Sequence, residues 1–212
     1  PGSWLVQAKV VVNAAGPWAD AVRRLADPQA TNIVRRSKGI HIVYPKLPLT
    51  RAVVLSAPRD GRIYFVIPWR GWSLIGTTDT DHDAAPEKAR ATADDVAYLL
   101  EETNQLLPGL GLAKERIVTT FAGVRPLAAS ARRSATTGLG LAAGRDGDRV
   151  PWQMSRSHRL HEDPNGLLTI VGGKYTTYRA IAEEVVDRVV RRLGRPSIAC
   201  RTAEVPLATA PG

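Results

Sequence analysis

Two strand-like runs, each followed at once by a glycine turn and a helix, restrict most strongly what this chain can fold into. The first run, Leu5 to Ala14, meets Ala15-Gly16-Pro17, and the second, Leu167 to Val171, meets Gly172-Gly173. Amide groups at a helix start attract an anion, and glycine lets a ligand approach the backbone closely. The two junctions therefore indicate a nucleotide-binding α/β arrangement, with ordinary tight turns as the alternative.

Each glycine turn is expected to lead into an amphipathic helix. Pro17 suits the first turn of the first helix, whose inward face we expect to carry Trp18, Val22 and Leu25. The second helix should end at Gly194. Its apolar residues, which recur at helical spacing, are Ile181, Val185, Val189 and Leu193.

The middle of the chain has a different pattern. Four strand-like runs follow one another with only turns between them, which predicts an antiparallel sheet. These runs are Gly39 to Tyr44, Ala52 to Ser56, Arg62 to Trp69 and Ser73 to Thr78. A helix over Thr92 to Leu107 should open with a capping box between Thr92 and Asp95, and a strand over Ile117 to Phe121 should end near Arg125.

Composition excludes several classes of site. A single cysteine, Cys200, rules out an internal disulfide, and the four histidines form no cluster at metal-ligand spacing. No apolar run approaches the roughly 20 residues that span a bilayer. The net charge of +9 favours anionic partners, but without interleaved aromatic and basic residues we expect no nucleic-acid binding.

The order of the sequence blocks points to a family. The blocks VVNAAGPWAD, SKGIHIVYP, RIYFVIPW, LIGTTDT, AGVRPL, SRSHRL and TIVGGKYTTYR occur in this order. Together they resemble the FAD-dependent glycerol-3-phosphate dehydrogenases, from about Val6 to Val190. Other members of the wider glycine-oxidase-like flavoprotein superfamily share the NAAGPW element but not the whole set.

The resemblance implies a mixed α+β and α/β fold. Residues 1–35 and 155–200 would be remnants of a Rossmann-like FAD-binding domain of the glutathione-reductase type, and residues 36–127 an antiparallel substrate-binding sheet flanked by helices. Residues 128–154 would form a flexible loop and 201–212 a linker. The family's G-x-G-x-x-G turn, an early arginine and the C-terminal helical domain do not occur in these 212 residues. We therefore expect an internal fragment, inactive by itself.

The resemblance also implies a reaction. The full-length protein would oxidise sn-glycerol 3-phosphate to dihydroxyacetone phosphate, passing a hydride to FAD and electrons to a quinone. Such an enzyme would be cytoplasmic and peripherally attached to the membrane, and a homodimer is an expected assembly. No metal is implied.

Three residues are the candidate catalytic groups: His41, Arg125 and Lys174. A guanidinium at a strand end can grip two oxygens of a phosphate, and Lys174 at the glycine turn can hold a substrate oxygen, since a lysine at a helix start is otherwise disfavoured. The imidazole of His41 can accept the hydroxyl proton, although a core histidine or a surface arginine remains the alternative. Arg156 and Thr78 complete the expected substrate ligands, beside Arg125 and Lys174.

The family blocks also supply candidate flavin contacts. Thr77, Thr78 and Asp79 match a block near the substrate side of the flavin, and the alternative for Asp79 is a hydrogen-bond acceptor in a turn. His158 and His161 are expected on an edge strand and His82 in a turn. The residues carried over as flavin ligands are Ala15, Gly16, Trp18, Gly172, Gly173, Lys174, Tyr175 and Thr176.

Two alternative functions stay open. One is a related FAD-dependent amine or amino-acid oxidase, against which the pairing of Arg125 and Lys174 favours a phosphate substrate. The other is a non-catalytic basic module that binds phospholipid heads, which the positive charge would allow.

Overall fold

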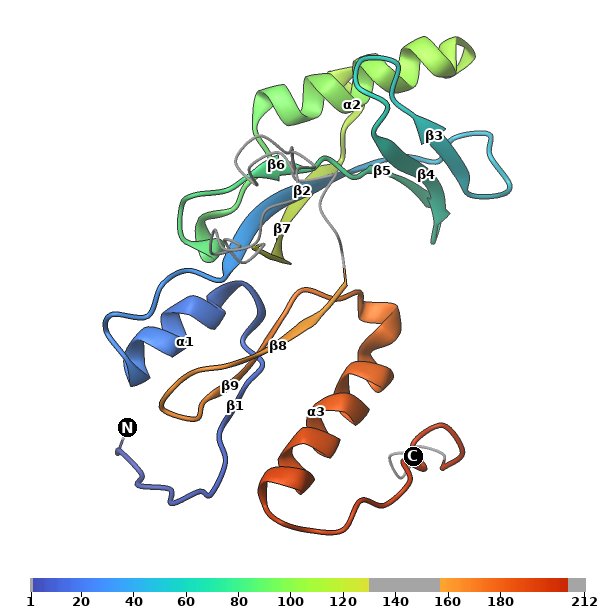
Figure 1. Ribbon diagram of the computed structural model, residues 1–212. Helices are drawn as coiled ribbons and strands as arrows, with labels where there is room; N and C mark the ends of the chain where they lie inside the picture. Colours follow the sequence, from blue (N-terminus) through green and yellow to red (C-terminus); the bar gives the residue numbers. More distant parts are fainter. Residues whose placement is uncertain (1, 130–156, 206–212) are drawn as a thin grey trace, which may run out of the picture. The chain divides into compact units, whose positions relative to one another are not determined.

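The computed structural model describes residues 2–129 and 157–205 (Figure 1). These residues form two compact units, and the boundary falls between Val34 and Arg35. The three-stranded unit contains residues 2–34, 128–129 and 157–205, and the six-stranded unit contains residues 35–127. Each unit has its own sheet, and the mixed α/β fold class predicted from the sequence is confirmed.

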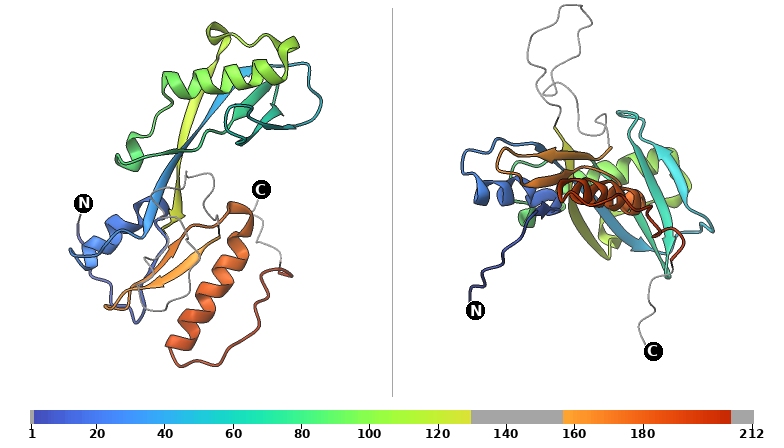
Figure 2. Two further views of the ribbon diagram at one scale, coloured as in Figure 1. Left: turned by 45° about the horizontal axis from the view of Figure 1, so that its top comes forward. Right: turned by 60° about the horizontal axis from the view of Figure 1, so that its bottom comes forward.

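The sheet of the six-stranded unit is antiparallel, as the closely spaced runs predicted. Its strand order is β3-β4-β5-β2-β6, and β7 also pairs with β2. The strands are β2 (Val34–Pro45), β3 (Val53–Ser56), β4 (Ile63–Trp69), β5 (Trp72–Gly76), β6 (Thr80–Asp81) and β7 (Thr119–Ala128). The helix α2 (Ala93–Leu106) lies across one face of this sheet (Figure 2), and three single turns of 3-10 helix, η2 (Pro86–Lys88), η3 (Pro108–Leu110) and η4 (Lys114–Arg116), flank it in sequence.

Alternate residues of β2 point to opposite faces of the sheet. Ile40, Ile42 and Tyr44 are fully buried and pack with α2 residues such as Leu99. Residue His41 lies between them in sequence and therefore points to the other face. We call this other face, which α2 does not cover, the open face.

A bulge interrupts the pairing along one edge of β2. The strand pairs with β5 up to His41, opposite Gly76, and with β6 from Lys38, opposite Thr80. Between these points two residues of β2 face three residues, Thr77–Asp79, on the connection from β5 to β6. We call this segment the 77–79 bulge; extra residues of this kind bend a strand and redirect its side chains.

The sheet of the three-stranded unit has the order β1-β9-β8. Strand β1 (Val12–Asn13) runs parallel to β9 (Leu168–Val171), and β8 (Arg159–Glu162) is antiparallel to β9. Helices α1 (Ala19–Ala26) and α3 (Tyr178–Arg192) flank the sheet (Figure 1). A 3-10 turn precedes each helix, η1 (Gly16–Trp18) before α1 and η7 (Tyr175–Thr177) before α3.

The prediction of a buried strand over Leu5 to Ala14 is wrong for most of its length. Only Val12–Asn13 pair with β9, and Leu5 is 92% exposed. A strand is buried only where neighbouring strands and helices cover it, and the described residues offer β1 a neighbour on one edge alone. A prediction from apolar composition alone therefore overestimated the length and the burial of this strand.

The expected inward face of α1 is also wrong. Leu25 is 87% exposed, whereas Ala19, Asp20 and Arg23 are buried. The carboxylate of Asp20 accepts hydrogen bonds from two backbone amides at 3.1 Å each, and Arg23 donates to Asp163 at 2.6 Å. Arg23 lowers the pKa of the Asp163 carboxyl. A polar network, which periodicity does not reveal, decides which side of α1 points inward.

The capping box of α2 is confirmed and extends into the sheet. The side chain of Thr92 accepts from the Asp95 amide at 3.3 Å, and the Asp95 carboxylate accepts from the Thr92 amide at 2.9 Å. The same carboxylate accepts from Lys38 of β2 at 2.5 Å, and both charged side chains are nearly buried. This ion pair joins the start of α2 to the strand that carries His41.

We predict that Lys38→Met lowers the free energy of unfolding by about 3 kcal/mol, because it leaves the buried Asp95 carboxylate without its counter-charge. Urea unfolding would measure the change. Lys46→Met, at an exposed lysine just after β2, is the matched control and should change stability by less than about 0.5 kcal/mol. A similarly small loss for Lys38→Met would contradict the stabilising role of the pair.

Candidate functional site

His41 lies on the open face of the six-stranded sheet, where its ring is held between two neighbours. The imidazole stacks on Phe121 of β7, with 5.0 Å between ring centroids and 11° between planes. It also lies over Gly76 of β5, where a Cβ would come within 2.7 Å of the His41 ring. No hydrogen bond joins the His41 ring nitrogens to any residue of the described ranges. The ring is thus oriented by packing and not by a polar partner.

The surroundings of His41 keep its imidazole neutral. Partial burial lowers the pKa of His41 below its ordinary value of about 6.5, and the positive charge of Arg125 lowers it further. A neutral imidazole has one ring nitrogen with a lone pair. His41 is therefore equipped to accept a proton at neutral pH.

Arg125 lies inside β7 and not at a strand end, so this part of the sequence prediction is wrong. Strand β7, which pairs with β2, runs from Thr119 to Ala128 and so extends beyond Arg125. The guanidinium donates to the backbone oxygen of Thr78 at 3.2 Å and to Thr77 Oγ1 at 2.8 Å. Its side chain is 27% exposed, so it is fixed by the 77–79 bulge and still reaches solvent.

The 77–79 bulge surrounds Arg125 with acceptors. Thr78 is buried, and its hydroxyl accepts a hydrogen bond from the Ile40 amide at 3.0 Å. Asp79 is also buried, accepts from Ser37 and lies 3.7 Å from Arg125 Nη1. In this structure Thr78 supports Arg125, and its direct contact with a substrate stays a prediction.

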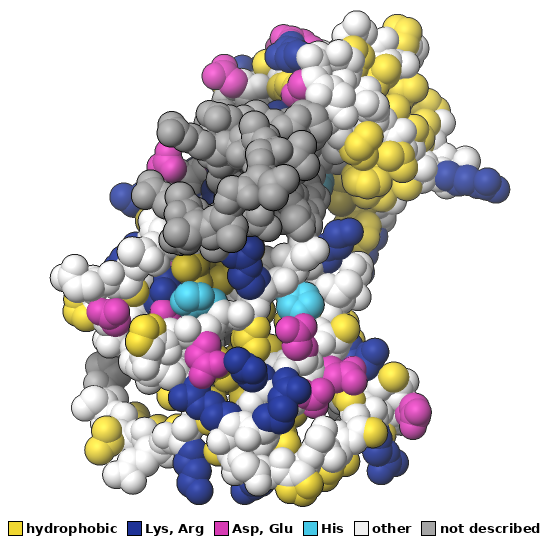
Figure 3. All heavy atoms as spheres, viewed as in Figure 1, with side chains coloured by type: hydrophobic (Ala, Val, Ile, Leu, Met, Phe, Trp, Pro, Cys, Tyr) yellow, Lys and Arg dark blue, Asp and Glu magenta, His cyan; other side chains and the backbone are white. Residues whose placement is uncertain are grey.

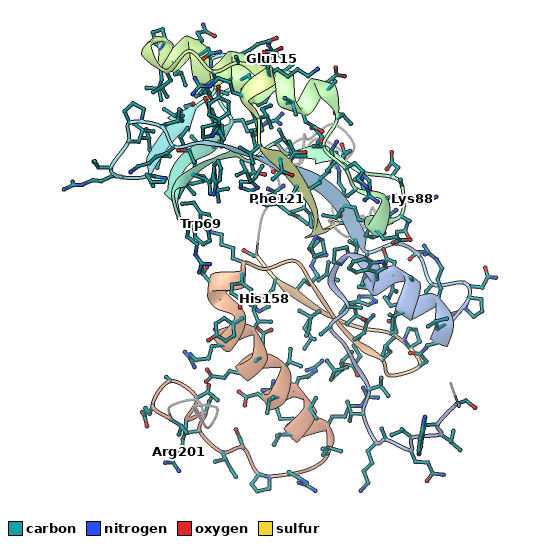
Figure 4. The ribbon with its side chains drawn as sticks, turned by 180° about the vertical axis from the view of Figure 1, so that it is seen from behind. Trp69, Lys88, Glu115, Phe121, His158 and Arg201 are labelled. Atoms are coloured by element: carbon teal, nitrogen blue, oxygen red, sulfur yellow. The ribbon has the colours of Figure 1, made fainter. Side chains whose placement is uncertain are left out.

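The open face around these residues is strongly apolar. Hydrophobic side chains gather over β3 and β4 (Figure 3), and Phe121 extends from β7 (Figure 4). Partly exposed apolar residues on β3, β4 and β5 that share the face with His41 by register are Val54, Ile63, Phe65, Trp69 and Trp72. A cation and an imidazole next to such a surface suit a small charged ligand beside a planar apolar ring.

The second glycine turn belongs to the three-stranded unit. Gly172 and Gly173 have φ values of 77° and 93°, and their missing Cβ atoms leave room for Ser157 O and Ile181 Cδ1, each 2.7 Å from the ideal position. Close packing inside the unit therefore explains both glycines. Lys174, at the start of η7, has an exposed side chain.

The residues after Lys174 are also accessible. Tyr175 is 90% exposed, Thr176 is exposed, and the Tyr175 ring lies 5.8 Å from that of Tyr178. Lys174 belongs to the three-stranded unit and Arg125 to the six-stranded unit. Their convergence on one ligand stays a prediction.

Asn13, which the sequence analysis missed, organises the first glycine turn. Its buried side chain donates to Ala19 O at 2.9 Å and to Thr169 of β9 at 3.3 Å, and accepts from the Ala15 amide at 3.1 Å. Gly16 has a φ of 54°, and a Cβ there would meet nothing within 4 Å. This open space next to the start of a helix fits the close approach of a cofactor, with Ala15 and the half-exposed Trp18 beside it.

The remaining candidates are dispersed. Arg156 lies outside the described residues. His158 lies just before β8 and contacts Glu184 at 2.6 Å, His161 lies in β8 beside Asp163 at 3.1 Å, and His82 contacts Ala85 O at 3.1 Å. These contacts tie the three histidines to their own neighbours.

Two absences concern only the described part of the chain. Within residues 2–129 and 157–205, no cluster of three or more His, Cys, Asp or Glu side chains is arranged to bind a metal ion. No helix in the same ranges combines the length and the apolar character needed to cross a bilayer.

Comparison with known proteins places this geometry in a family. A family model described as "FAD dependent oxidoreductase" matches residues 2–179. The aerobic glycerol-3-phosphate dehydrogenase of Staphylococcus haemolyticus is 38% identical over 208 residues, which is 95% of this chain and 34% of that protein. The chain spans about one third of the length of the curated relatives it matches.

Solved structures show the same similarity. The crystal structure of the glycerol-3-phosphate dehydrogenase from Bacillus halodurans, complexed with FAD, matches with a TM-score of 0.73 and 33% identity, over 93% of this chain and 35% of that chain. Iminodiacetate oxidase from Chelativorans sp. BNC1 matches with a TM-score of 0.54 and 18% identity, over 95% of this chain and 47% of that chain. The second match shows a shared fold alone.

We predict that His41 titrates below the ordinary histidine pKa and that Arg125→Gln moves its pKa upward, because one of the two causes of the depression is removed. Imidazole NMR signals followed against pH would measure both values. Arg70→Gln, in the turn between β4 and β5, should leave the pKa of His41 unchanged. An unchanged pKa in Arg125→Gln would show that the guanidinium exerts no effective field at His41.

Proposed function

This chain belongs to the family of FAD-dependent oxidoreductases, and from that premise we propose that it forms the substrate-binding part of a glycerol-3-phosphate dehydrogenase. The enzyme would oxidise sn-glycerol 3-phosphate to dihydroxyacetone phosphate. The observation that carries the proposal is an anchored cation, Arg125, beside a half-buried neutral imidazole, His41, on one face of one sheet. The identity with relatives named for this reaction supports the same substrate.

The proposed chemistry needs three contributions from the protein. Oxidation at C2 removes a proton from the hydroxyl oxygen and a hydride from the carbon. FAD, when bound, supplies the hydride acceptor. In our proposal His41 takes the proton on a ring nitrogen, and Arg125 holds the phosphate dianion so that the C2 hydroxyl lies near His41. Lys174 and Arg156 would add positive charge to the substrate oxygens.

The two glycine turns of the three-stranded unit would hold FAD. At the first turn these residues are Ala15, Gly16 and Trp18, and at the second Gly172, Gly173, Lys174, Tyr175 and Thr176. The open space at Gly16 and the exposed side chains after Gly173 support this assignment. The apolar open face would exclude water from the reacting atoms.

Further proposals concern the rest of the enzyme. A quinone would receive the electrons, and the complete protein would be a cytoplasmic homodimer that attaches peripherally to the membrane. The net charge of +9 supports attraction to anionic lipids. The word "aerobic" in the name of the Staphylococcus haemolyticus relative is compatible with a respiratory acceptor.

We predict that glycerol 3-phosphate bleaches the flavin absorbance of the complete enzyme under anaerobic conditions, whereas glycine does not. In Arg125→Ala, the KM should rise about 10- to 100-fold because a charged hydrogen bond to the phosphate is lost. Rapid-mixing spectroscopy would measure both effects. Arg51→Ala, at an exposed arginine before β3, serves as the control and should behave like the parent.

Two outcomes would contradict the proposal. Bleaching by glycine but not by glycerol 3-phosphate would favour an amino-acid oxidase. An unchanged KM in Arg125→Ala, with flavin retained, would remove Arg125 from the substrate site.

A further inference from the structure

Arg125 crosses a neighbouring strand to reach its partners. Strand β7 pairs with one edge of β2, and on that edge the amide of Val118, just before β7, donates to Val43 O at 3.0 Å. The 77–79 bulge lies on the other edge, where the Ile40 amide donates to Thr78 Oγ1. The guanidinium of Arg125 must therefore pass over β2 to bond the bulge.

The crossing point is Gly39. A Cβ built on this buried residue would collide with both terminal nitrogens of Arg125 and with Thr77 Oγ1. Gly39 is part of a regular strand and has no left-handed backbone conformation that would demand glycine. Its missing side chain is thus explained by the space that the guanidinium, together with the Thr77 hydroxyl bonded to it, occupies.

The bulge completes the enclosure of the guanidinium. Thr77 and Thr78 accept its hydrogen bonds, and the buried carboxylate of Asp79 provides a negative charge 3.7 Å from Nη1. Ser37, fully buried, donates to that carboxylate and fixes it. The position of the guanidinium is therefore fixed by β2 and by the 77–79 bulge, whose Asp79 supplies the counter-charge.

We propose that Gly39 is a positioning residue for Arg125: it leaves open the groove across β2 through which the guanidinium is held against the 77–79 bulge and aimed at an anionic substrate. This inference rests on the proposed function, which assigns Arg125 to the substrate phosphate. A side chain fixed before binding loses little conformational freedom when the ligand arrives, so the groove would strengthen anion binding.

A double-mutant cycle tests this role in the complete enzyme. Gly39→Ala should displace the guanidinium, which is the mobile end of a flexible side chain, and raise the KM for glycerol 3-phosphate about 10- to 100-fold, as Arg125→Ala does. The combined variant Gly39→Ala with Arg125→Ala should be no worse than Arg125→Ala alone, because the guanidinium is then absent and the Thr77 hydroxyl, freed from its bond to Arg125, can rotate away from the added methyl. Inorganic phosphate, used as a competitive inhibitor, should lose affinity in the same pattern.

Gly123→Ala is the matched control. Gly123 lies in β7 between Phe121 and Arg125, and a Cβ there would meet nothing within 4 Å. The same chemical change should leave the KM and the inhibition by phosphate at parent values. An effect of Gly123→Ala equal to that of Gly39→Ala would contradict a specific groove.

Melting temperatures of the single and combined variants distinguish a role of Gly39 in positioning Arg125 from a role in the stability of the sheet. If Gly39→Ala is destabilised, removal of the guanidinium in the combined variant should restore stability. A loss of stability or of affinity that persists undiminished in the Arg125→Ala background would overturn the inference, because Gly39 would then serve the sheet itself. If Arg125→Ala leaves the KM unchanged, the proposed function fails instead, and the thermal cycle still decides whether Gly39 positions Arg125.

Discussion

The passage of the Arg125 guanidinium over Gly39 is the contact on which the rest of the site depends. It connects β7 to the 77–79 bulge across β2, so three strands must keep their register for the two hydrogen bonds to form. The guanidinium on β7 would lose its partners on the bulge if either β7 or the bulge slipped by one residue along β2. The register of the three strands therefore determines where the Arg125 guanidinium lies.

The two faces of this sheet have different roles: the covered face packs the core, and the open face carries the candidate site. On the covered face, Ile40, Ile42 and Tyr44 pack with α2, and the Lys38–Asp95 pair joins the strand to the helix start. On the open face, the ring of His41 is held by stacking and by a glycine beneath it, in the field of a fixed cation. A rigid covered face lets the open face hold polar groups among apolar ones without losing their geometry.

Local signals in the sequence predicted much of the fold and the kinds of residue in the candidate site. They did not predict the contacts that hold those residues in place. The capping box of Thr92 and Asp95 was predictable because it involves residues three apart, and turns between short runs predicted the antiparallel sheet. The sequence could not show that Arg125 lies inside a strand and crosses Gly39, since that depends on pairing between distant segments. The run Leu5 to Ala14 was misjudged because burial depends on neighbours and not on composition alone.

The most direct test of the account is a crystal structure of the complete enzyme with glycerol 3-phosphate bound. The account predicts that Arg125 keeps its bonds to the 77–79 bulge and donates to the phosphate at about 3 Å, with His41 next to the C2 hydroxyl. A phosphate bound away from Arg125, or an Arg125 side chain that leaves Gly39 to reach it, would contradict the account.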